Sequence, residues 1–98
     1  MNESKIQKTS VAVFGETRDA RLVAKFYEPD GQLYEVVFCR NPYGTHNLML
    51  ACDGDTIRHG NAATLSLVEF LANHYGAKKF LKKVRHFLGK RLVRKMWR

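Results

Sequence analysis

The chain has 98 residues, of which 45% are hydrophobic and 11% aromatic, and it carries a formal net charge of +8. This composition allows a small hydrophobic core and excludes disordered, collagen-like and disulfide-rich classes, the last because two cysteines are too few. No apolar run approaches the ~20 residues that a membrane-spanning helix needs, and no signal peptide is visible near Met1. We therefore expect a single domain over residues 1–98, a cytoplasmic location and reduced cysteines.

The first part of the chain predicts antiparallel strands, because runs rich in β-branched and aromatic residues alternate with Gly, Pro, Asn and Asp. The expected strands cover residues 9–14, 21–28, 32–40, 47–52 and 55–59. Within the second of these, Leu22, Ala24 and Phe26 should share one face. The polar residues 16–20 before it should form a turn, and Asp53-Gly54 suits a two-residue type I′ turn.

After the last strand, the hydrophobic period changes to that of a helix. Asn61 can cap a helix that ends at Tyr75, and Gly76 suits the position that follows. A second, basic helical segment is expected over residues 77–98. This order predicts an α+β fold, in which an N-terminal antiparallel β-meander of three to five strands (9–59) precedes two or three C-terminal helices.

The charge is divided very unevenly along the chain. Residues 1–76 contain seven basic and nine acidic residues, whereas residues 77–98 contain ten basic residues and no acidic one. Uncompensated like charges on a helix repel one another, so the segment favours an anionic partner. The ten candidate contact residues are Lys78, Lys79, Lys82, Lys83, Arg85, Lys90, Arg91, Arg94, Lys95 and Arg98.

The apolar residues of this segment form two stripes. At 100° per residue, the stripe of residues 80–88 and that of residues 92–97 differ by about half a turn of helix across Gly89. One straight helix cannot bury both stripes against one surface. Either the helix breaks at Gly89, or its end packs on a partner for which Leu92, Met96 and Trp97 would be the anchors.

The first functional hypothesis is non-catalytic binding of nucleic acid through the cationic C-terminal helices. Lysine and arginine neutralise phosphates, and aromatic side chains such as Trp97 and His86 can stack on unpaired bases. No RNP motif, zinc-finger spacing, KH loop or basic-zipper heptad is present, so we expect no sequence-specific readout. The choice between DNA and RNA stays open.

The alternative hypothesis is an accessory factor or inhibitor, of the kind that phages use as modulators. Such a protein would dock its basic C-terminal segment on an acidic surface of a larger nucleic-acid-processing enzyme. A membrane surface is a weaker match, because Gly89 divides the amphipathic pattern into two short halves. A homo-oligomer that covers the second apolar stripe also stays open.

We expect no enzyme activity, no cofactor and no bound metal. Cys39, His46, Cys52 and His59 follow a spacing that matches no standard zinc site. No phosphate-binding glycine loop, nucleophile elbow or pair of carboxylates suited to acid–base chemistry is present.

Overall fold

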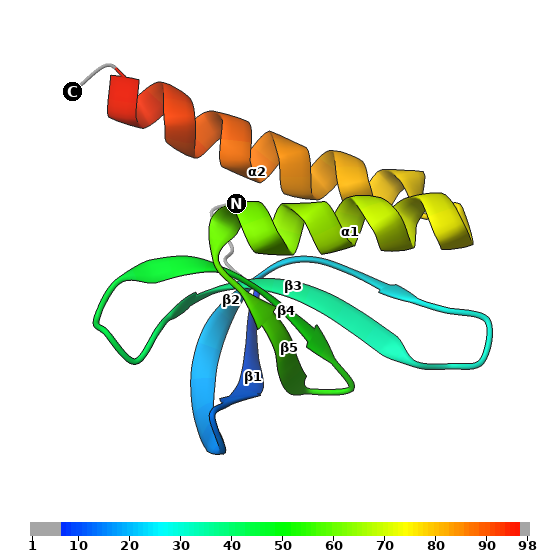
Figure 1. The fold of residues 1–98 in the computed structure, drawn as a ribbon, viewed down its shortest axis with the longest axis horizontal. Coiled ribbons are helices and arrows are strands. Elements are labelled where there is room, and N and C mark those ends of the chain that lie inside the picture. Colours follow the sequence, from blue (N-terminus) through cyan, green and yellow to red (C-terminus); the bar gives the residue numbers. More distant parts are fainter. Residues whose placement is uncertain (1–6, 97–98) are drawn as a thin grey trace.

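The computed structural model describes residues 7–96, with side chains described as far as Arg91. Its elements follow the expected order of strands first and helices last (Figure 1). They are β1 (Lys8–Val13), β2 (Glu16–Tyr27), β3 (Leu33–Arg40), β4 (His46–Cys52), β5 (Asp55–His59), α1 (Asn61–Tyr75) and α2 (Lys78–Met96). The predicted α+β class, with an antiparallel meander followed by C-terminal helices, is confirmed.

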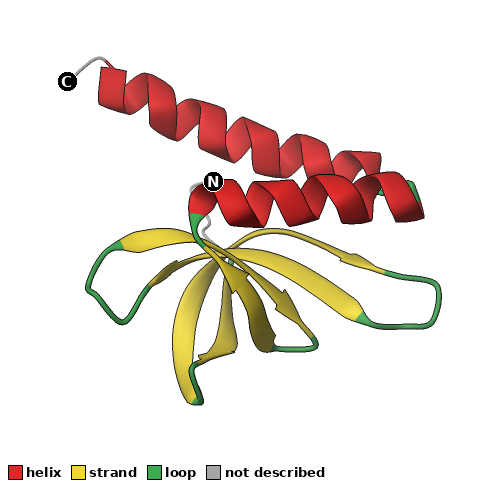
Figure 2. Cartoon of the chain, viewed as in Figure 1, coloured by secondary structure: helices red, strands yellow, loops and turns green. Residues whose placement is uncertain are grey.

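The five strands lie in sequence order, and each is antiparallel to the next. The sheet curls until β1 meets β5 in a single parallel pairing, Ala12 with Asp55, which closes it on itself. Both helices lie on one side of this sheet (Figure 2). α1 contacts β4 and β5, and α2 contacts α1 and β2, so the two helices cover different strands.

Two hydrophobic cores lie on opposite faces of the sheet. Between the sheet and the helices, Val36 and Leu50 of neighbouring strands are buried against Val68 of α1 and Val84 of α2. Inside the curled sheet, the alternating residues form a second cluster of Val11, Val13, Ala20, Val37, Cys39, Met49 and Ala51. Because both faces of β3 and β4 are covered, these strands are apolar over consecutive positions rather than at every second one.

The start of β2 differs from the prediction. Residues 16–20 form no turn but pair with β1, from Val13 with Glu16 to Thr9 with Ala20. The turn is the dipeptide before them, where Phe14 and Gly15 have φ values of 50° and 81°. The polar composition of 16–20 was misleading because a strand at the rim of a curled sheet can expose most of its side chains.

The face assigned to Leu22 was also wrong. The pairing of β2 with β3 shifts between Leu22 and Ala24, which is the mark of a β-bulge. Leu22 therefore packs against the cluster inside the curled sheet, whereas Ala24 and Phe26 pack against the helices. A strict period of two cannot predict this change, because the bulge inserts one residue into the alternation.

Asn61 does not cap α1 as predicted. Gly60 occupies the N-cap, and the Oδ1 atom of Asn61 instead accepts a hydrogen bond of 2.8 Å from the backbone N–H of Leu48. One turn later, the Thr64 hydroxyl donates to the Leu48 carbonyl at 3.2 Å. These bonds fix the start of α1 on β4. The other end agrees with the prediction, because Gly76 has φ 70° and terminates the helix in the left-handed conformation.

The helix α2 continues through Gly89 without a break as far as Met96. The interruption considered at Gly89 is therefore absent, and the first stripe enters the core through Phe80 and Val84. The predicted partner anchors Leu92, Met96 and Trp97 lie outside the described side chains, so their role stays a prediction. Over residues 7–96, neither helix is long and apolar enough to cross a membrane.

Candidate nucleic-acid interface

The packing of α2 decides which of its basic residues face solvent. Because Phe80 and Val84 are buried against the sheet, the remaining faces of the helix are left outside. Six of the ten predicted contact residues are exposed in this way: Lys78, Lys79, Lys82, Lys83, Arg85 and Lys90. Arg91 is half-buried, and the side chains of Arg94, Lys95 and Arg98 lie outside the described part.

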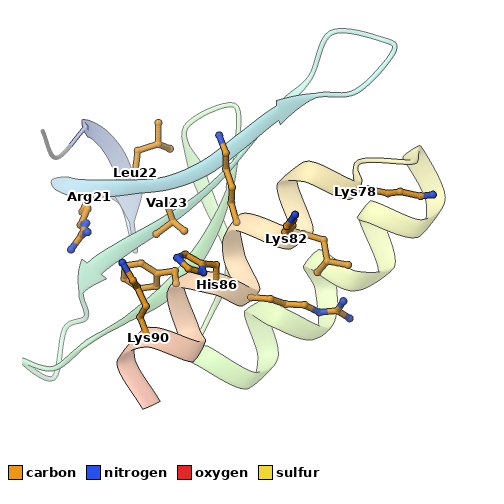
Figure 3. Close-up of a pocket in the computed structure, with 11 residues that line it drawn as sticks. Arg21, Leu22, Val23, Lys78, Lys82, His86 and Lys90 are labelled. Atoms are coloured by element: carbon orange, nitrogen blue, oxygen red, sulfur yellow. The ribbon is translucent and has the colours of Figure 1, made fainter. Parts of the chain in front are cut away.

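An open groove of about 850 Å³ separates α2 from β2 (Figure 3). Exposed cations form its rim, and half-buried apolar side chains, among them Val23, Leu81 and Phe87, form its floor. The basic residues that line the groove are Arg21, Lys78, Lys82, Lys83, Arg85, His86 and Lys90. The structure thus brings five of the predicted lysines and arginines together with His86, whereas Lys79 is exposed but does not line the groove.

The positive charge of the groove is little compensated. In the described part of the chain, the ion pairs are Arg18 with Glu16 at 3.0 Å and Arg85 with Glu69 of α1 at 2.8 Å. Among the described residues that line the groove, Arg85 is therefore the one paired with a carboxylate. The side chains of this pair are 57% and 41% exposed, so solvent weakens their attraction and Arg85 remains accessible to another anion.

Two arginines, Arg21 of the groove and Arg91 next to Lys90, are held against aromatic rings. The guanidinium carbon of Arg21 lies 5.2 Å from the centre of the Phe87 ring, and that of Arg91 lies 4.2 Å from the centre of the Phe38 ring. The two rings are themselves 5.4 Å apart. Stacking of this kind restrains the planar guanidinium while leaving its N–H groups free to bind an anion.

Arg21 is the basic residue of the groove that the sequence did not indicate. It belongs to the near-neutral part of the chain, and only the docking of α2 on β2 places it beside Phe87. The predicted strand over 21–28 could have indicated that Arg21 faces outward, but a strand pattern says nothing of the helix that will lie next to it.

Neither cysteine is activated as a nucleophile. Burial is the main cause that raises the pKa of Cys39, and burial likewise raises the pKa of Cys52, where Asp53 adds to the effect. Both thiols stay protonated at neutral pH, and the thiolate is the reactive form. Within the described ranges no three His, Cys, Asp or Glu side chains are grouped so that they could hold a metal ion.

Comparison with protein families, with curated proteins and with solved structures finds no match to this chain.

Proposed function

We propose that this protein binds nucleic acid without catalysis, through the groove between α2 and β2. The observation that supports this proposal is the combination of a cationic rim with an apolar floor. The rim suits phosphates, whose counterions are released when lysine and arginine replace them. The floor, which includes Val23 and Leu81, suits contact with the apolar face of an unpaired base.

The dimensions of the rim fit several consecutive phosphates. Lys78 and Lys90 are twelve residues apart on one continuous helix, which corresponds to about 18 Å at the usual rise per residue. Between them, Lys82 and Arg85 line the same groove. A chain of phosphates laid along α2 therefore meets a cation at every turn of the helix.

An acidic protein segment is the second candidate, because the apolar floor would also accept a hydrophobic side chain from such a segment. The two candidates differ in their response to salt. Binding of nucleic acid falls steeply and continuously as salt is added, since each contact releases counterions. A protein interface anchored by apolar side chains is much less sensitive to salt.

The test compares two lysines of the same helix that differ in position. Lys82 lines the groove and Lys79 does not, although both are exposed. We expect Lys82→Glu to weaken binding of a labelled oligonucleotide by about tenfold, as the loss of a charged hydrogen bond implies. Lys79→Glu makes the same change in net charge and should weaken binding by much less.

Fluorescence anisotropy at constant salt measures both affinities, and circular dichroism confirms that both variants are folded. Equal weakening by the two substitutions would mean that the helix attracts anions only through its overall charge. Absence of binding by the unmodified protein, to single or double strands at low salt, would refute the proposed function and direct attention to the protein partner.

A further inference from the structure

A second hollow, of about 370 Å³, lies on the strands next to the groove. Pairing places Lys8 of β1 opposite Arg21 of β2, and Arg21 opposite Phe38 of β3. Directly paired residues of a sheet project from the same face, so these three side chains form a row across the strands. We call this the strand hollow; it is lined by Lys8, Asp19, Ala20, Arg21, Phe38, Cys39, Arg40 and His46.

The strand hollow is cationic. Lys8, Arg21, Arg40 and His46 line it, against a single carboxylate, that of Asp19. No ion pair in the described part of the chain involves Lys8, Asp19, Arg21 or Arg40. Burial raises the pKa of the Cys39 thiol, which keeps a further negative charge out of the hollow at neutral pH.

The strand hollow and the groove are joined through stacked side chains. Arg21 lines both and lies over Phe87, while Arg91 lies over Phe38. The imidazole of His46 is also stacked on Phe38, with 5.5 Å between ring centres. Guanidinium groups and aromatic rings thus form a continuous surface from α2 across β2 and β3 to β4.

We propose that the strand hollow binds a phosphate of the same nucleic acid that occupies the groove, and that this ligand is a single strand. The inference rests on the proposed function and extends it. A hollow of about 370 Å³ has room for one phosphodiester and its sugar. A duplex is stiff over ~150 base pairs, whereas a single strand can bend from the groove over Arg21 to Arg40.

The apolar floor of the groove supports the same assignment. The faces of bases are stacked on one another inside a duplex and are accessible only in a single strand. Val23 and Leu81 therefore have a natural partner in an unpaired base, whereas a duplex would offer them only its phosphates and groove edges.

The experiment measures affinity against the length of the strand, by anisotropy with labelled oligothymidylates of about 4 to about 16 nucleotides. A short strand can occupy the groove alone, and a longer one can reach the strand hollow as well. We expect affinity to rise with length. The variant Lys8→Gln/Arg40→Gln should bind the shortest strand normally but show about tenfold less affinity for the longest.

The matched control is Lys25→Gln/Arg58→Gln, which removes the same two charges from exposed positions that line neither the groove nor the strand hollow. Its affinity should match that of the unmodified protein for strands of every length. If the two double variants lower the affinity for the longest strand equally, the strand hollow is not a contact site and the inference is wrong.

Three further outcomes are informative. A duplex that binds as tightly as the single strand, and loses as much affinity on Lys8→Gln/Arg40→Gln, would overturn the assignment to single strands. If Lys8→Gln/Arg40→Gln binds like its control while Lys82→Glu still lowers the affinity for every strand, the strand hollow is not a contact site but the proposed function stands. Absence of binding at all lengths would refute the proposed function and this inference together.

Discussion

Phe14 is a residue in an unfavourable backbone conformation. It has φ 50° in the two-residue turn between β1 and β2, although its side chain is 72% exposed. A bulky residue in the left-handed region is destabilised by roughly 1–2 kcal/mol, and asparagine tolerates this region much better. The only aromatic contact of Phe14 in the described part is with His59, at 5.4 Å between ring centres.

We therefore expect Phe14→Asn to stabilise the protein. The gain should be about 0.5–1 kcal/mol, because relief of backbone strain exceeds the loss of a solvent-exposed ring contact. For a domain of this size, the melting temperature should rise by roughly 2–8 °C in a thermal scan. Gly15→Ala, at φ 81°, serves as the opposite control and should lower it. A fall on Phe14→Asn would show that the contact with His59 outweighs the strain.

At the scale of elements, the sequence predicted the strands and helices from turn residues and periodicity. Pro29, Gly31 and Gly76 all mark ends of elements that the structure confirms, since each of these residue types restricts or permits a particular φ. The bulge after Leu22 and the hydrogen bond that Asn61 accepts from Leu48 depend instead on neighbouring strands. Such features are tertiary, so no local pattern indicates them.

The continuity of α2 at Gly89 can be tested directly. Gly89 is exposed and helical, and no atom outside its own helix and chain neighbours lies within 4 Å of the position that a Cβ would take. Alanine should therefore stabilise the helix by about 0.5–1 kcal/mol, measured by urea unfolding. Gly76→Ala is the control, because Gly76 has a positive φ and alanine there should be destabilising. Destabilisation by Gly89→Ala would mean that the helix does break there.

In the whole molecule, the basic residues that gather on one face come from both ends of the chain, and the sequence indicated only those of α2. The basic residues of α2 could be identified because residues 77–98 contain ten basic residues and no acidic one. Lys8, Arg21 and Arg40 could not be identified from the sequence, because they are scattered along a nearly neutral segment. Only the register of β1, β2 and β3 and the docking of α2 bring them to one face.

The salt dependence of binding shows how many phosphates the protein contacts. If about five cations of the groove and the strand hollow contact phosphates, the logarithm of the association constant for a single strand should fall with the logarithm of salt concentration, with a slope of roughly −3.5. Lys82→Gln should make this slope less steep by about 0.7 to 1, while Lys79→Gln should leave it unchanged. A slope near zero would contradict the account, because it would show that the cations of the groove do not contact phosphates.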